Sequence, residues 1–180
     1  MTAVTRWTAW HDHWGKEVAA FAVDTAEGLV FFDPLDPPRE LPGPAHVLIT
    51  VFFHARSAGS LDARIWAPAS QVRRLKNRGV VVTDPFEIGD GLPGGIQAFE
   101  TGRLGEVVYW LPDQKVLVAG DVLLGSPFRL CPKSWLERDA TQDDLRERLR
   151  PLLELPIEQI FVGHGEPVLT DGRDALRDLL

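Results

Sequence analysis

Hydrophobic residues along this chain fall into short runs that are separated by turn-forming residues, a pattern typical of β-strands. Several of the runs are rich in valine, isoleucine and phenylalanine. They cover Glu17–Val23, Leu29–Asp33, Val47–Val51, Ala63–Ala67, Ile96–Phe99, Val107–Leu111, Val116–Ala119 and Ile160–Val162. Most of them are of strand rather than helix length. The pattern therefore predicts a protein built from many short strands.

A clear helix signal begins at Thr141. The segment Thr141–Asp144 has the form of a capping box, in which a threonine and an acidic residue three positions later satisfy the first backbone groups of a helix. Three leucines follow at helical spacing, at positions 145, 149 and 152. Pro151 predicts a bend near the end of this helix, because proline cannot donate the backbone hydrogen bond that a helix interior needs.

Two further helices and one long loop are expected. The helices are predicted at Ala69–Asn77, directly after Pro68, and at Arg173–Leu180. Asp33–Pro44 is too rich in proline for a strand or a long helix and is predicted to be a loop. We find no linker and no internal repeat, so we expect one domain over residues 1–180. Strands that alternate with helices indicate an α/β protein.

Composition and charge exclude several classes of protein. The 26 acidic and 19 basic residues give a net charge of -7, so there is no basic footprint for nucleic acid, although a small local anion site stays open. Cys131 is the only cysteine, which excludes an intrachain disulfide and a thiolate-rich metal cluster and favours a reducing cytoplasm. The N-terminus has no signal-peptide pattern, and no apolar run reaches about 20 residues. We expect neither export nor a membrane partner.

Several predicted strands end in short polar motifs that follow one another in a definite order. An early strand ends in Asp33, a later one in Gly120-Asp121, and the last in Gly163-His164-Gly165. The full set of segments is Leu29–Pro34, Val47–Thr50, Ile65–Pro68, Gly105–Leu111, Lys115–Leu123 and Ile160–Pro167. In this order the chain resembles the metallo-β-lactamase superfamily, over roughly residues 17–169.

The resemblance implies a fold. Members of this superfamily form an αββα sandwich, in which two packed mixed β-sheets are flanked by helices. We expect a trimmed version of that α/β fold here, because the segment before Val47 is too short for a long helix.

The same resemblance implies a metal site, but most of the ligand positions of that site are changed. The family carries a His-x-His-x-Asp-His loop after a threonine, and this loop aligns without gaps with the segment that starts at Thr50. The family also carries a histidine after a middle strand, and in this chain the Gly102–Gly105 segment takes its place. The residues at the ligand positions are, in order, Val51, Phe53, Ala55, Arg56 and Arg103, followed by the retained Asp121 and His164. The metal-binding motifs are therefore degenerate.

This substitution predicts that the site holds no metal cofactor. A catalytic zinc needs three protein ligands and an open position for water, and only Asp121 and His164 remain. A divalent ion would also be repelled by the Arg56 guanidinium. Two unit charges about 4 Å apart at an effective dielectric of about 20 interact by roughly 4 kcal/mol, so the repulsion of a divalent ion is about twice that. The alternative is one zinc, iron or manganese ion held by this pair together with His11 or His13.

The altered site has two interpretations. In the first, Arg56 and Arg103 form structural salt bridges with Asp121 in a vestigial pocket, because an unpaired buried carboxylate is costly. In the second, the two arginines and His164 line a cleft that binds a carboxylate or phosphate by bidentate hydrogen bonds. His54 lies in the same loop. We interpret it as polar surface, with a displaced ligand or an acid/base group as the alternative.

Other residues add little chemistry. Ser57 is the only hydroxyl next to the altered loop, and no Gly-x-Ser-x-Gly elbow frames it. Cys131 is expected to pack as a small apolar residue. The tryptophans at positions 7, 10 and 14 are expected to cover a core edge or form the lip of a pocket.

The sequence thus predicts a non-metallated and catalytically inactive binding protein with a pocket lined by arginine. Its expected partner is a small anionic ligand, and self-association into a homo-oligomer is left open. The alternative is a hydrolase of the same superfamily with a remodelled or mononuclear metal site, which would act on an ester, thioester, amide or phosphoester.

Overall fold

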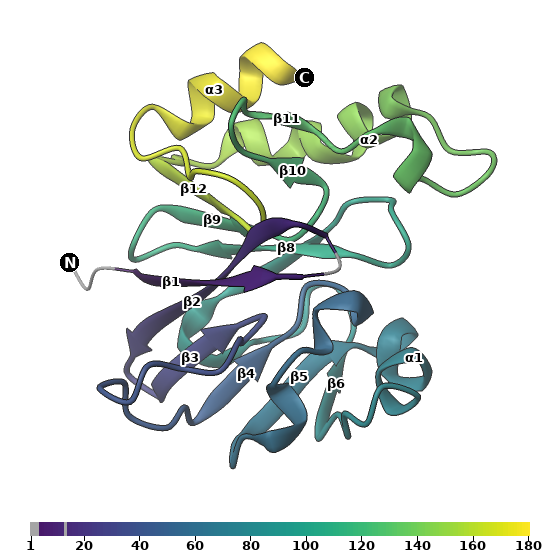
Figure 1. Ribbon diagram of the computed structural model, residues 1–180. Helices are drawn as coiled ribbons and strands as arrows, with labels where there is room; N and C mark the ends of the chain where they lie inside the picture. Colours follow the sequence, from purple (N-terminus) through teal and green to yellow (C-terminus); the bar gives the residue numbers. More distant parts are fainter. Residues whose placement is uncertain (1–3, 13) are drawn as a thin grey trace.

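The computed structural model describes residues 4–12 and 14–180, and within them two large β-sheets pack face to face (Figure 1). The first sheet has six strands in the order β1-β2-β3-β4-β5-β6, of which β1 to β3 are antiparallel and β3 to β6 parallel. Its strands are Thr5–His11 (β1), Lys16–Thr25 (β2), Gly28–Phe32 (β3), His46–Leu48 (β4), Arg64–Pro68 (β5) and Asp84–Phe86 (β6).

The second sheet has four strands in the order β12-β9-β8-β7. Its strands β12 and β9 are parallel, whereas β9, β8 and β7 are antiparallel. The strands are Gln97–Glu100 (β7), Val107–Leu111 (β8), Val116–Ala119 (β9) and Gln159–Val162 (β12). A separate two-stranded ribbon pairs Leu123–Leu124 (β10) with Arg129–Leu130 (β11). Both large sheets are therefore mixed.

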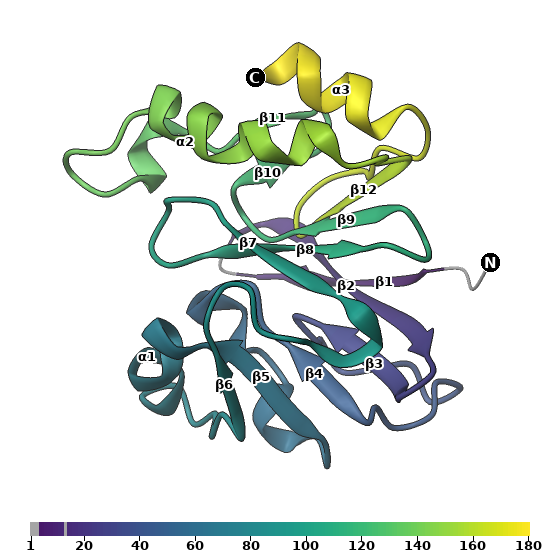
Figure 2. The ribbon, with the colours of Figure 1, turned by 180° about the vertical axis from the view of Figure 1, so that it is seen from behind.

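Helices lie on the outer faces of the two sheets. Helices α2 (Gln142–Leu149) and α3 (Gly172–Leu179) cover the four-stranded sheet, and α1 (Val72–Lys76) lies beside the six-stranded one, as Figures 1 and 2 show from opposite sides. Short 3-10 turns occupy Phe52–Ala55, Ala58–Ser60, Ala69–Gln71, Pro93–Gly95, Lys133–Trp135 and Arg150–Glu154. Within the described ranges, no helix is long and apolar enough to cross a membrane.

The core has three layers of apolar contact that hold this sandwich together. Between the sheets, Phe21 packs on Phe161 and Phe32 on Tyr109. Along β2 the intervening alanines face the opposite side and join the layer around α1, since side chains alternate across a strand. Under α2 and α3 the buried side chains include Leu117, Ile160, Leu145, Leu149 and Leu176. The αββα architecture and its helix-flanked mixed sheets are thus confirmed.

Most predicted elements are present. The eight hydrophobic runs all contain strands, although the run from Val47 leaves the sheet after Leu48. The capping box forms as predicted: Thr141 accepts a hydrogen bond from the backbone of Asp144 and donates its own backbone N–H to that carboxylate. The α-helix ends at Leu149 and continues as a 3-10 turn through Pro151. The proline-rich segment is a loop.

The sheets also determine where a site can form. The parallel strands β3 and β4 end at one edge of the six-stranded sheet, and the parallel strands β9 and β12 end at one edge of the other. The two edges meet, because the Ala19 amide donates to the Gly163 carbonyl at 2.9 Å and the Val107 amide donates to the Thr50 carbonyl at 3.0 Å. Loops that follow these four strands therefore converge.

Candidate functional site

The loops that follow β3, β4, β9 and β12 bring four ionisable side chains together. Asp33 directly follows β3, and His54 lies on the 3-10 turn after β4. Asp121 and His164 each come two residues after the end of β9 and β12, whose last residues pair in register. The retained Asp–His pair of the sequence thus meets because two parallel strands end side by side.

His54 lies between two carboxylates. Its Nδ1 is 2.7 Å from Asp33 Oδ2, and its Nε2 is 3.1 Å from Asp121 Oδ1. The side chain is only 4% exposed, so the interpretation of His54 as polar surface is wrong. An ionised carboxylate can only accept hydrogen bonds, and each ring nitrogen faces one. Both nitrogens of His54 must then donate, which makes the ring an imidazolium.

The electrostatics of this arrangement favour the charged ring. Burial lowers the pKa of His54, and the nearby Arg56 cation lowers it further, but the carboxylates of Asp33 and Asp121 outweigh both and raise it to about 9. The pKa of Asp121 moves the opposite way: burial raises it, whereas the charge of His54 and the hydrogen bond from His164 hold it below its ordinary value. The cation and the carboxylates therefore stabilise each other.

Thr50 connects Asp33 to the same loop. Its backbone N–H donates to Asp33 Oδ1 at 2.8 Å, and its hydroxyl donates to Asp33 Oδ2 at 2.6 Å. Because a buried carboxylate needs donors for both oxygens, these bonds fix the orientation of Asp33 toward His54.

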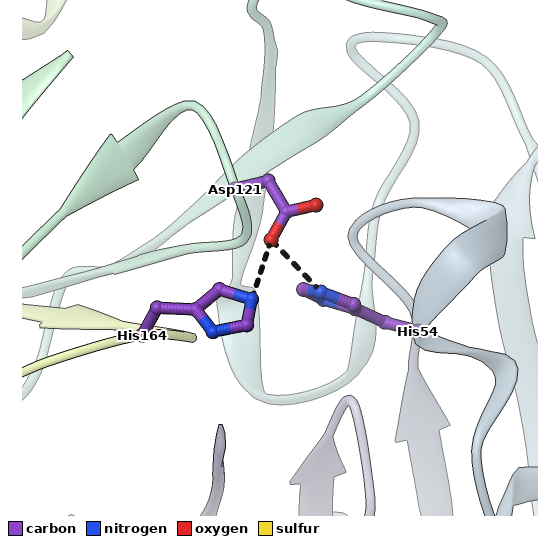
Figure 3. A group of neighbouring side chains, drawn as sticks. All are labelled: His54, Asp121 and His164. Carbon is purple, nitrogen blue, oxygen red and sulfur yellow. Dashed lines mark hydrogen bonds and ion pairs between the residues drawn. The ribbon is translucent and has the colours of Figure 1, made fainter. Parts of the chain in front are cut away.

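Asp121 has two further nitrogen partners. His164 Nε2 lies 3.1 Å from the same Oδ1 that faces His54 (Figure 3). The Oδ2 atom lies 3.5 Å from Nη2 of Arg103. The carboxylate of Asp121 is thus surrounded by three nitrogen donors.

Arg103 is held in place by Glu106. Its Nη1 donates to Glu106 Oε2 at 2.5 Å, and Glu106 Oε1 accepts the backbone N–H groups of Asp121 at 2.6 Å and Val122 at 2.9 Å. A Cβ atom at Gly120 would lie 2.7 Å from Glu106 and 2.5 Å from the Thr50 hydroxyl. Glycine is therefore required before the aspartate, so that these polar groups can close around the turn.

Glu106 is a site residue that the sequence analysis missed. It is 1% exposed, and burial raises its pKa to about 7 even though the Arg103 charge lowers it. The available signal was its spacing of three residues from Arg103, just before a buried strand.

Arg56 occupies a different place from the one predicted. Its Nη1 donates to the backbone carbonyls of Ala19 at 2.6 Å and Asp33 at 2.8 Å, and the ion pairs of Asp121 come from His54, His164 and Arg103. The predicted salt bridge between Arg56 and Asp121 is therefore wrong. The backbone of Arg56 has a positive φ of 38°.

A cavity of about 410 Å³ opens onto this cluster. It is lined by His11, Trp14, Val18, Leu35, Phe53, His54, Arg56, Arg78, Asp121 and His164. The indole of Trp14 stacks on the ring of His164, with 5.6 Å between centroids and 20° between planes. Trp14 thus forms the lip of the pocket, whereas Trp7 is buried in the core.

The other predicted residues contribute less. His11 lines the cavity and contacts Trp14, and His13 lies outside the described residues. Ser57 donates its hydroxyl to Asp36 at 2.6 Å. Cys131 is fully buried in the layer under the helices, as expected for an apolar residue, and burial raises the pKa of its thiol to about 11. Within the part of the chain that the structure describes, the cavity lining has no serine or cysteine nucleophile.

Three side chains converge closely enough to be considered as metal ligands. One ligand atom each of His54, Asp121 and His164 lies within 4.8 Å of the others. Among the described residues the convergent histidine is His54. Of the two histidines expected as alternatives, His11 is not in this group and His13 lies outside the described residues. Three donors are the number that a catalytic zinc uses, and Asp33 orients His54 as an outer carboxylate does in metal sites. The donor set is therefore sufficient in number.

The charges around these donors oppose the binding of a divalent ion. Both imidazoles face one oxygen of Asp121, while Arg103 faces the other. An ion must first displace the proton of His54, whose pKa of about 9 makes that proton cost about 3 kcal/mol at pH 7. With an imidazolium and two arginines at the site, the positive charge that a metal would supply is already present.

Comparisons with known proteins point to one family. The model of the metallo-beta-lactamase superfamily matches residues 7–164. Similar solved structures include DIM-1 metallo-beta-lactamase, with 18% identity, a TM-score of 0.73, and coverage of 98% of this chain and 92% of that one. A metallo-beta-lactamase from Pontibacter korlensis has 16% identity and a TM-score of 0.72, and the match covers 99% of this chain and 98% of that one.

A third similar structure is FIM-1 from Pseudomonas aeruginosa in a mono-zinc form, with 14% identity, a TM-score of 0.71, and coverage of 97% of this chain and 87% of that one. At these identities the structures show a shared fold. No curated protein matches the sequence of this chain.

Proposed function

The chain belongs to the metallo-beta-lactamase superfamily, and on that premise we propose that it is a metal-independent binding protein for a small anionic ligand. One observation carries the proposal: each ring nitrogen of His54 faces a carboxylate oxygen, of Asp33 on one side and of Asp121 on the other. The imidazolium of His54 does here what a metal ion does for the same kind of carboxylate, which is to neutralise it in a buried site.

The same geometry argues against metal-dependent hydrolysis. Metal-dependent hydrolases of this kind activate water by lowering its pKa to about 7 on the ion. A protonated imidazole between two carboxylates cannot take a proton from water. The hydrogen-bonding positions of Asp121 are also filled by His54, His164 and Arg103. Neither His54 nor Asp121 is therefore free to act as a base.

The charges lining the cavity support an anionic ligand. Arg56 and Arg78 both line it, and the charge of Asp121, the one acid among its lining residues in the described chain, is offset by the His54 imidazolium and by Arg103. Guanidinium groups recognise carboxylate and phosphate through paired hydrogen bonds. A small anion is thus the chemical class that complements this pocket.

A second candidate function rests on the convergence of His54, Asp121 and His164. If His54 gave up its proton, these three residues would hold one zinc, iron or manganese ion, and Asp33 would orient the first of them. The ion would supply an activated water for hydrolysis of an ester, thioester, amide or phosphoester. Arg103 and Arg56 oppose this state through their charges.

Metal analysis separates the two functions. We expect protein purified without chelators to contain well below one equivalent of zinc, iron and manganese, and we expect no metal uptake after incubation with zinc at pH 7 and desalting. Esterase and phosphodiesterase screens should be silent, while calorimetry should detect binding of acetate or inorganic phosphate. Metal at about one equivalent that disappears in His164→Ala would establish the hydrolase candidate instead.

A further inference from the structure

Arg78 is a cation without a carboxylate partner at the mouth of the cavity. It follows α1, its side chain is exposed, and it forms no ion pair within residues 4–12 and 14–180. Its guanidinium lies over two aromatic rings, 5.4 Å from the centroid of Phe52 and 5.2 Å from that of Phe53. Such stacking holds a guanidinium plane in place while its N–H groups stay free to bind.

The rings beneath Arg78 are themselves fixed. The centroids of Phe52 and Phe53 are 4.0 Å apart, and the guanidinium of Arg74 lies 4.9 Å from the centroid of Phe52. Arg74 also donates to the Leu104 carbonyl at 3.1 Å. Arg78 is therefore an arm restrained by an aromatic platform, and less entropy is lost when such an arm binds a ligand.

The rest of the cavity wall is largely apolar. Trp14 and Phe53 line it while remaining 45% and 43% exposed, and Val18 and Leu35 add further apolar surface. Large exposed aromatic side chains on a cavity are typical of surfaces that take a flat apolar group. The cavity volume of about 410 Å³ is enough for a small ring system.

We propose that this cavity binds an aromatic carboxylate, with the carboxylate paired to Arg78 and the ring against Trp14 and Phe53. This proposal deepens the proposed function, on which it rests, because it names the class of anion that the same pocket takes. Inorganic phosphate or acetate satisfies the guanidinium but leaves the aromatic wall in water. An aromatic carboxylate satisfies both, so it binds more tightly than either small anion.

Calorimetry with 2-naphthoate tests this assignment on the full-length protein. We expect 2-naphthoate to bind at least tenfold more tightly than acetate, and 2-naphthylmethanol, which lacks the charge, to bind weakly. Arg78→Gln should weaken 2-naphthoate about tenfold and leave 2-naphthylmethanol unchanged. Phe53→Ala should weaken both aromatic probes.

Two matched variants control for charge and for location. Arg73→Gln removes the same charge from exposed helix α1 outside the cavity lining, so it should leave 2-naphthoate binding unchanged. Arg129 lines a neighbouring cavity that also contains Trp14 and His164, so Arg129→Gln reports a ligand that sits there instead. Equal losses in Arg73→Gln and Arg78→Gln, or a loss only in Arg129→Gln, would overturn the assignment to Arg78.

The outcomes also separate this proposal from the one on which it rests. If acetate and phosphate bind but 2-naphthoate binds no better, the anion pocket stands and the aromatic specificity is wrong. If none of the three anions binds, both proposals are wrong. Thermal unfolding of each variant distinguishes loss of binding from loss of folding, because these exposed side chains are expected to change stability little.

Discussion

His54→Leu is expected to destabilise the protein by about 3–5 kcal/mol, since it removes the cation between two buried carboxylates. Asp33 and Asp121 are 1% and 3% exposed, so neither can recover its lost hydrogen bond from water without opening the structure. Asp121 keeps His164 and Arg103, whereas Asp33 keeps only the donors of Thr50. Urea denaturation at pH 7 measures the change in unfolding free energy.

His46 provides a matched control for this variant. It is also a buried histidine, but its ring nitrogens face the Trp66 indole and the Glu27 carbonyl rather than carboxylates. His46→Leu should cost only about 1–3 kcal/mol, the cost of leaving neutral hydrogen-bonding groups unpaired. Adding Asp33→Asn to His54→Leu should recover part of the loss, because it removes one stranded charge. Equal losses at the two histidines, with no recovery in the double variant, would mean that His54 carries no special charge role.

The proximity of Asp121 and His164 could be predicted from the sequence because strand ends are encoded locally. Asp121 and His164 each follow a compact run of apolar residues that forms a buried strand. Parallel pairing then places the ends of those runs side by side. The core strands and the capped helix could be predicted for the same reason, since their patterns depend on near neighbours in the chain.

His54 could not be assigned in this way, because its direction depends on a turn. In a 3-10 turn each residue rotates by about a third of a circle, so adjacent side chains point to different sides. On Phe52–Ala55, Phe53 remains 43% exposed while His54 is 4% exposed. A gapless alignment counts positions along the chain and cannot follow that rotation. It therefore assigned the ligand positions to Phe53 and Ala55, one residue to either side of His54.

The missed strands have a related cause. In β1, Trp7 is the one residue that the sandwich buries, so the segment has no hydrophobic alternation to signal a strand. It pairs with β2 along seven residues through backbone hydrogen bonds, which depend little on side-chain type. Strands β6, β10 and β11 have only three, two and two residues. Such short segments form because the larger sheets and loops are already in place.

The stability of the protein is expected to fall as the pH rises from about 7 to 9, by about 2 kcal/mol. The pKa of His54 is raised from its ordinary value of 6.5 to about 9, so in this window the native state holds a proton that the unfolded chain has released. The contribution is fully present below pH 6.5 and is lost as the pH passes through the native pKa. Burial raises the pKa of Glu106 to about 7 and that of Cys131 to about 11. The stability changes that come from Glu106 lie mostly below pH 7, and those from Cys131 mostly above pH 9.

Urea denaturation at pH 7, 8 and 9 should give a declining free energy of unfolding for the natural sequence and a nearly constant one for His54→Leu. Equal slopes in the two proteins, or a His54 ring that titrates near 6.5 by NMR, would show that its proton is not held by Asp33 and Asp121.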